Sequence, residues 1–435
     1  MRKNTKIKTI AILGIFGICA TVVLLNNITK DDNIIIDEEN TISKDLEGTI
    51  SFVSNRTDKS EELNLLIEEF EELHPKVKVD LELIGNPEEI LQRKATVQDL
   101  PDVTLVPASI KTSEYYKYFL KIDDLGFDGS NTYNNGLGLD DKGDMYGLMT
   151  SLNWYGIIYN KEIFKELNID ALPTTKEEFL EICEVIKENG ITPIVLNYRD
   201  SWRIKPWLEI VPYLFDEYLE DKVIKNNMDI LDENSGMFKS LEFIRSIVQN
   251  GYCEEDLLNY QWNKAKTDIR DGKVAMLFLS SDFKYQLNDI GMEMEKIGMF
   301  PFPGSDSIKV FGDYKMAISK DTKYPDVAKE FLKFLFEDSR YANAVNIVSS
   351  LKDNEKSKEF FKEIEEFNLP IITNDGTLES KYYDNENIHS KYDTLRRTVG
   401  LDYPFVQRYV IEDNTKDIID EINKKWNELE GEIVD

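Results

Sequence analysis

Apolar residues near the start of the folded chain change period in a regular way, and each change marks a predicted strand or helix. Residues 49–53 and 100–106 form short β-prone runs, and apolar and polar residues alternate through 77–83. Between residues 53 and 77, apolar residues recur at helical spacing (Leu63, Leu66, Ile67, Phe70 and Leu73). We predict a helix there, capped by Asp58 and Glu61 and ended by Pro75. Strands separated by helices indicate a parallel α/β sheet.

The central segment 145–207 repeats this pattern. The uncharged run 155–159 predicts a buried strand, and 192–196 predicts a second one. Between them, Thr174 and Glu177 have the spacing of a capping box, and Gly190 is placed to end the helix. A polar and aromatic loop, 197–202, follows the second strand, where open α/β sheets bind ligands.

Later parts of the chain continue the alternation. Residues 269–279 predict a helix end, a glycine turn and a buried strand. The segments 297–304 and 312–319 predict further strands, and 324–335 predicts a helix with proline near its start. The chain finishes in an amphipathic pattern (Ile418, Ile422, Trp426 and Leu429) that predicts a final helix.

The N-terminus differs from everything that follows. Four basic residues (Arg2, Lys3, Lys6 and Lys8) precede the apolar run 10–25, which is the layout of a signal peptide or membrane anchor. No A-x-A cleavage site follows, and the surroundings of Cys19 resemble a lipoprotein box only loosely. We expect an exported protein, with an uncleaved or otherwise cleaved signal favoured over lipid on Cys19. The acid-rich segment 26–47 is interpreted as a solvated tether.

Composition narrows the function. The formal net charge is -30, which argues against nucleic acid and is compatible with an uncharged or a cationic ligand. Two histidines and three cysteines offer little for a metal cluster or a histidine-based triad, so we predict no cofactor or metal. Cys183 and Cys253 are expected to be buried free thiols. No GxSxG, P-loop or HExxH motif is present, and a glycosidase carboxylate pair is not excluded by counting acids.

The central segment carries a resemblance. WYGIIYNKEIFKELNID and LPTTKEEFLEICEVIKENGITPI resemble the extracellular solute-binding proteins of ABC importers, in the sugar-binding group that includes maltose-binding protein. TISFVSNRTD and ISKDTKYPDVAKEFLKFL resemble the same family, so the resemblance covers about residues 48–345. It implies a monomer with two α/β lobes, each with a mixed, mostly parallel sheet, and a ligand cleft between them.

The resemblance also implies where the chain passes between lobes. Crossings are expected near 149–153, 310–316 and 346–352. Lobe 1 would then contain 48–150 and 313–348, and lobe 2 would contain 151–312 and 349–435. Closure of the lobes would capture the ligand.

A sugar site needs aromatic rings for stacking and planar polar groups for paired hydrogen bonds. The loops between the expected lobes supply such residues, and these are the predicted ligand contacts: Asn55, Arg56, Asn153, Trp154, Arg199, Asp200, Trp202, Asp282, Phe283, Asp313 and Tyr314. By the resemblance, Asp200 and Trp202 align with an acidic residue and a stacking aromatic in maltose-binding protein, and Asn153 aligns with a carboxylate.

Two departures from the family pattern stand out. Asp282-Phe283 replaces a tryptophan that many relatives carry, and Val106 replaces another aromatic, so we expect a ligand read differently from maltose.

Several of the predicted ligand contacts could instead have a purely structural role. Trp154 and Trp202 are ligand contacts or core residues, Asp313 is a contact or a turn residue, and Arg199 with Asp200 forms part of the site or a surface ion pair. Trp207 is expected in the core.

The sequence therefore predicts a binding subunit, not an enzyme, that captures an oligosaccharide and delivers it to an ABC permease at the extracellular face of the membrane. The alternatives are a binding protein for a polyamine or other cation, a glycan hydrolase, and a sensory ligand-binding module.

Overall fold

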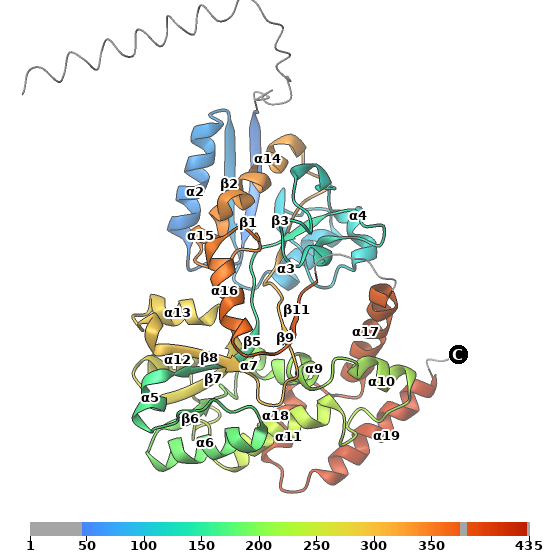
Figure 1. Cartoon of the computed structure of the whole chain (residues 1–435). Coiled ribbons are helices and arrows are strands. Elements are labelled where there is room, and N and C mark those ends of the chain that lie inside the picture. The colour runs from blue at the N-terminus through green and yellow to red at the C-terminus, as the bar shows by residue number, and fades with distance from the viewer. Residues whose placement is uncertain (1–45, 375–380, 433–435) are drawn as a thin grey trace, which may run out of the picture. The chain divides into compact units, whose positions relative to one another are not determined.

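The computed structural model describes residues 46–374 and 381–432, with side chains for 46–374 and 388–429 (Figure 1). The predicted signal or anchor, Cys19 and nearly all of the predicted tether lie outside the described residues. Within them, no helix is both long and apolar enough to cross a membrane.

The first sheet confirms the predicted parallel start. Its strands lie in the spatial order β2 (Val77–Leu83), β1 (Gly48–Ser54), β3 (Val103–Leu105), β10 (Lys315–Ile318) and β4 (Gly147–Met149). β1 pairs in parallel with β2 and β3, whereas β10 is antiparallel to β3 and β4. β3 is shorter than the predicted 100–106 at both ends, and at its start Pro101 has no N–H to donate. Instead, the Asp102 carboxylate accepts hydrogen bonds from the backbone N–H and the hydroxyl of Ser51.

Helices cover this sheet (Figure 1). They are α2 (Ser60–Leu73), α3 (Pro87–Thr96), α4 (Tyr115–Tyr118), α14 (Pro325–Phe336) and α15 (Arg340–Ala344). Phe52 of β1, Phe70 of α2 and Phe331 of α14 form edge-to-face ring pairs in the core. The predicted cap of α2 is wrong: the helix begins at Ser60 with no side-chain cap, because Asp58 binds Arg56 instead.

The second sheet has the order β6 (Thr192–Val195), β7 (Val274–Ser280), β5 (Tyr155–Asn160) and β8 (Ile297–Pro301). It is mixed, as predicted, but its parallel share is smaller than expected. β6 and β7 are parallel, whereas β5 is antiparallel to both β7 and β8. β5 enters directly from the first sheet, so it runs against its neighbours instead of completing a parallel strand–helix–strand unit with β6.

The helix before β6 shows a capping box displaced by one residue from the prediction. α6 (Lys176–Glu188) is capped by Thr175 and Glu178, not by Thr174 and Glu177. Thr174 contributes as well, since its hydroxyl donates to Glu178 Oε2 at 2.9 Å. The predicted stop is confirmed, because Gly190 has a φ of +77° just after the helix.

The remaining helices surround the second sheet and close the chain: α5 (Lys161–Glu166), α7 (Ser201–Ile204), α8 (Pro206–Glu209), α9 (Val211–Phe215), α10 (Leu219–Lys225), α11 (Gly236–Gln249), α12 (Trp262–Arg270), α13 (Phe283–Asp289), α16 (Glu355–Glu365), α17 (Lys381–Thr398), α18 (Tyr403–Ile411) and α19 (Lys416–Glu432). Trp207 is buried in their core, as predicted. Cys183 and Cys253 are buried free thiols, as expected.

The chain passes between the two sheets at three places. The connections are 150–154 between β4 and β5, 310–314 between β9 (Ile308–Lys309) and β10, and 345–354 between α15 and α16. β9 pairs with the short strand β11 (Ile371–Ile372). The backbone N–H of Asn153 donates to Phe311 O at 2.7 Å, and that of Leu152 donates to Val348 O at 2.9 Å. These hydrogen bonds join the connections side by side.

Candidate functional site

A cavity of about 470 Å³ lies beside these connections. Its walls come from the β1–α2 loop, the first two connections, α12 and α13, and segments near α15. The lining residues are mostly polar: Asn55, Arg56, Thr57, Asp58, Gly85, Thr150, Ser151, Asn153, Trp262, Lys266, Asp282, Gln286, Asp313, Tyr341 and Ile347. Its volume falls in the range of small-molecule sites.

The β1–α2 loop forms the first wall, defined here as Asn55–Asp58, and it carries a charge that is already paired. Arg56 binds Asp58 through two hydrogen bonds, Nε to Oδ1 at 3.0 Å and Nη2 to Oδ2 at 2.9 Å. Burial opposes the charge on Arg56, but these bonds outweigh it and raise the pKa of the guanidinium. The loop therefore presents a fixed guanidinium edge.

Asp313, in the second connection, lies between the walls. Asn55 Nδ2 donates to its Oδ2 at 2.7 Å, and its backbone N–H donates to Ser151 Oγ at 3.0 Å. Enclosure by the surrounding protein raises the pKa of Asp313 to about 6, with a further contribution from the charge of Asp282. Its side chain is still reached by solvent, so the carboxylate is open to a ligand.

The second wall, defined here as α12 and α13 with the loop before α13, carries Asp282 and Lys266. Asp282 accepts a hydrogen bond from the Ser280 hydroxyl, and burial raises the pKa of its carboxyl. Lys266 Nζ donates to Gln286 Oε1 at 3.0 Å, and burial lowers the pKa of the ammonium. This wall thus presents an amide, a carboxylate and an ammonium group to the cavity.

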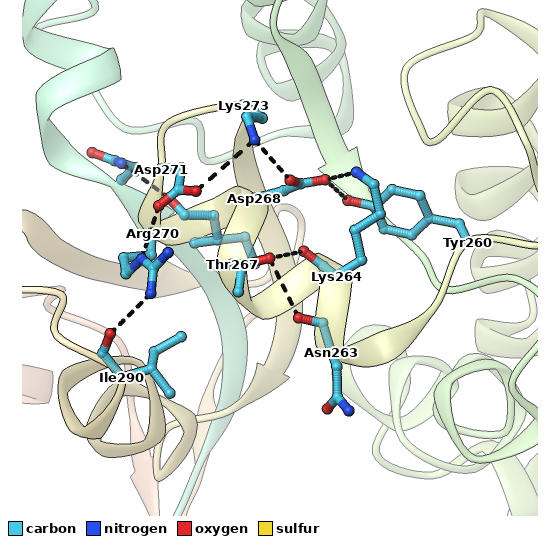
Figure 2. A network of polar contacts seen from close by, with 11 residues as sticks. Tyr260, Asn263, Lys264, Thr267, Asp268, Arg270, Asp271, Lys273 and Ile290 are labelled. Atoms are coloured by element: carbon cyan, nitrogen blue, oxygen red, sulfur yellow. Dashed lines mark hydrogen bonds and ion pairs between the residues drawn. The ribbon is translucent and has the colours of Figure 1, made fainter.

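A polar network fixes the orientation of α12 (Figure 2). Asp268 is buried and accepts hydrogen bonds from Lys264 and from the Tyr260 hydroxyl, the latter at 2.6 Å, and Lys273 lies 3.5 Å away. Burial opposes ionisation of Asp268, but the bonds from Lys264 and Tyr260 outweigh it and lower the pKa of the carboxyl. Trp262 and Lys266, four residues apart on the same helix, are held at the cavity by this anchor.

Trp202 and Trp262 form an edge-to-face pair, with ring centroids 4.9 Å apart and planes at 87°. Trp262 lines the cavity, and Trp202 is 47% exposed. Lys266 Nζ lies 5.3 Å from the centre of the Trp262 ring. The pair offers an aromatic surface next to polar groups, which is the combination that sugar faces require.

Five of the predicted contacts line the cavity: Asn55, Arg56, Asn153, Asp282 and Asp313. Tyr314 is half-buried and packs against the first core, while Arg199 and Asp200 approach to 3.6 Å in a partly exposed ion pair. None of these three lines the cavity.

Trp154 and Phe283 lie in the core, 1% and 0% exposed. Trp154 turns inward at the end of the first connection and packs on Phe367. Phe283 begins α13 with its ring against Trp262. Their predicted contact with ligand therefore does not match where the structure places them.

The cavity is also lined by four residues that were not among the predicted contacts: Trp262, Lys266, Gln286 and Tyr341. The i, i+4 spacing of Trp262 and Lys266 on a short helix was a usable signal. Tyr341 gave none, because it reaches the site from α15, far along the chain, where its hydroxyl lies 3.0 Å from that of Ser54.

Metal ligands do not gather anywhere in the described part of the chain: no three His, Cys, Asp or Glu side chains are placed to hold an ion. Burial raises the pKa of both Cys183 and Cys253, so neither thiol is activated.

The structure has two β-sheets, each packed with helices, that are joined by several connections with a polar cavity beside them. This arrangement defines a two-lobe binding protein. The chain belongs to the bacterial extracellular solute-binding protein family, whose model matches residues 54–339. The family resemblance drawn from the sequence is confirmed.

Proteins with similar sequences or structures include solute-binding proteins for sugars. The chain is 24% identical over 343 residues to a multiple sugar-binding protein of Streptococcus mutans, covering 75% of this chain and 78% of the relative. A binding protein of an ABC transporter from Bifidobacterium animalis subsp. lactis, solved with mannobiose, has a TM-score of 0.74 at 22% identity, covering 91% of this chain and 98% of that one. A manno-oligosaccharide-specific solute-binding protein from the same organism, solved with mannotriose, has a TM-score of 0.72 at 22% identity, covering 89% and 96%.

Proposed function

We propose that this protein captures an oligosaccharide in the polar cavity and delivers it to an ABC permease, without catalysing a reaction. The single observation that carries the proposal is the cavity itself, whose amide, carboxylate and cationic groups from both walls lie next to the Trp202–Trp262 pair. Sugars offer hydroxyl edges and apolar faces, and this lining matches both. The family and the ligands in the names of its relatives support the same class.

The proposed mechanism is closure of two lobes. Lobe 1 would contain 48–150 and 313–348, and lobe 2 would contain 151–312 and 349–435, so the paired connections act as the hinge. Asn55 and Arg56 would hold the ligand from lobe 1, and Asp282 and the tryptophan pair from lobe 2. A ligand that touches both lobes favours the closed state by its differential affinity.

Location follows from the family and from the N-terminal pattern. The protein would work as a monomer at the extracellular face of the membrane, tethered through the apolar run 10–25 and the acidic segment 26–47, with lipid on Cys19 as the less favoured attachment.

One observation favours a second ligand class. Asp282 and Asp313 bring two carboxylates to one cavity, and the chain carries a net charge of -30. A polyamine or another cation would be attracted to such a site.

A thermal-shift screen of the full chain separates these classes. The panel contains monosaccharides, manno-oligosaccharides, other neutral oligosaccharides and polyamines. A cognate sugar at about 100 times its Kd should stabilise the fold by about 2.7 kcal/mol. Stabilisation by polyamines alone would replace the carbohydrate proposal with the cationic one, and release of reducing sugar from any bound glycan would contradict a purely binding role.

A further inference from the structure

Arg203 is a buried cation whose guanidinium has no hydrogen-bond or ion-pair partner among the described residues. The residue is 3% exposed, and its Nε and Nη1 are buried without a hydrogen-bond partner. No carboxylate of the described chain lies within ion-pair distance of it. Burial lowers its pKa to about 10, so the guanidinium remains charged at neutral pH.

The nearest acids are engaged elsewhere. Both carboxylate oxygens of Glu254 accept backbone N–H groups, from Leu196 and Tyr198, each at 2.9 Å. Asp200 approaches Arg199 instead. Arg203 therefore feels these charges only at longer range.

Arg396 shows what a structural arginine looks like in the same half of the molecule. It is 4% exposed, and its guanidinium binds Asp393 at 2.6 Å, Glu209 at 3.3 Å and the carbonyl of Leu401 at 2.9 Å. The burial of the two arginines is almost the same, and only Arg203 lacks these compensating bonds. A buried charge without a partner destabilises a fold, so its presence needs another reason.

Its neighbours give that reason. The guanidinium carbon of Arg203 lies 5.4 Å from the centre of the Trp202 ring and 5.3 Å from that of Trp262. Both distances are within cation–π range. Trp262 lines the cavity and Trp202 is half exposed beside it, so Arg203 lies behind the aromatic surface that the ligand would meet.

We propose that Arg203 is a positioning residue of the binding site, whose unpaired guanidinium holds the Trp202–Trp262 pair in the orientation that stacks on the ligand. The proposal rests on the proposed sugar-binding function. Fixing two indoles before the ligand arrives lowers the ordering cost of binding. Arg203 thereby raises the affinity of the site for its ligand, although its buried charge lowers the stability of the unliganded fold.

The test compares Arg203→Met with Arg396→Met in the full chain. Methionine keeps much of the apolar stem and removes the charge in both variants. We expect Arg203→Met to leave the apo free energy of unfolding in urea unchanged or higher. The same variant should raise the Kd for the best oligosaccharide of the screen by about tenfold. Arg396→Met should do the reverse, lowering stability and leaving the Kd of the folded protein unchanged.

Two further measurements separate positioning from a structural role. Near-ultraviolet circular dichroism of the apo protein should lose tryptophan signal in Arg203→Met, because the coupled indole pair is released. Arg203→Lys, which retains a cation, should recover part of the affinity and the signal.

Destabilisation or failure to fold of Arg203→Met, or an unchanged Kd with an unchanged spectrum, would overturn the proposal. If the wild type binds no sugar, the proposed function fails. The stability and dichroism comparisons still decide whether Arg203 orders the two tryptophans.

Discussion

The two walls of the cavity handle charge in opposite ways. On the first wall, Arg56 is 16% exposed in its side chain and is matched at once by Asp58, two residues away in the same loop. Behind the second wall, Arg203 is more deeply buried and has no such partner. A charge paired within its own loop needs nothing from a ligand. The charge of Arg203 instead orients two tryptophans that face the ligand. The second wall is therefore the more specialised side of the site.

A core tryptophan at the end of the first connection should give the largest change in stability. Trp154→Ala should lower the apo free energy of unfolding by about 3–5 kcal/mol, because a fully buried ring leaves a cavity behind it. Urea denaturation measures this directly. An effect below about 1 kcal/mol would show that Trp154 is not a core residue and would return it to the set of ligand contacts.

Trp202→Ala should act on binding instead of folding. Its ring is 47% exposed, so the apo fold should lose little, while sugar affinity should fall by about 2 kcal/mol, the scale of an aromatic hot spot. Isothermal titration gives the affinity, and Trp207→Ala is the matched buried control. If Trp202→Ala unfolds the apo protein and the folded remainder binds normally, the site is misplaced.

Asp313, between the walls, should give the cavity a pH dependence. Its pKa of about 6 lies above the usual range, so the native state binds the proton more tightly than the unfolded chain. This carboxyl's contribution to stability is present at low pH and is lost as pH rises through 6. Because solvent reaches the side chain, we expect a loss of only about 1 kcal/mol.

Asp313→Asn removes this titration. The difference in unfolding free energy between the variant and the wild type, measured in urea from pH 4 to pH 7, should therefore rise with pH in favour of the variant. A difference that stays flat over this range would contradict the raised pKa of Asp313.

An ion pair between Lys59, which follows the first wall, and the second wall should contribute least to stability. Lys59, just before α2, lies 3.2 Å from Asp289 at the end of α13. Partly exposed pairs of this kind contribute about 0.2–1 kcal/mol. Lys59→Met should lower stability within that range, and the loss should fade in high salt. A loss that does not fade in high salt would contradict a contribution from the charge of Lys59.

The sequence predicted elements whose evidence is local. The apolar runs of β1 and β5 and the glycine after α6 can each be recognised from a few neighbouring residues. The capping box was displaced by only one residue. The direction of β5 was not predictable, because it depends on how the chain arrives from the first sheet.

The same limit applies to the cavity. Loop position was enough to choose Asn55, Asp282 and Asp313, which line it. It could not tell that Trp154 turns into the core while Trp262, on a helix, faces the opening. Side-chain direction at the ends of elements is decided by tertiary packing, and the unpaired state of Arg203 is visible only in three dimensions.

One ligand should contact both walls of the cavity at once. Hydrogen exchange followed by mass spectrometry, with and without a saturating oligosaccharide from the screen, measures contact at both walls in one experiment. We predict slower exchange in the β1–α2 loop and, in the same sample, in α12 and the start of α13, with α17 unaffected as an internal control. Protection confined to one wall, or located instead around α8 and α9, would show that the ligand does not bridge the two walls.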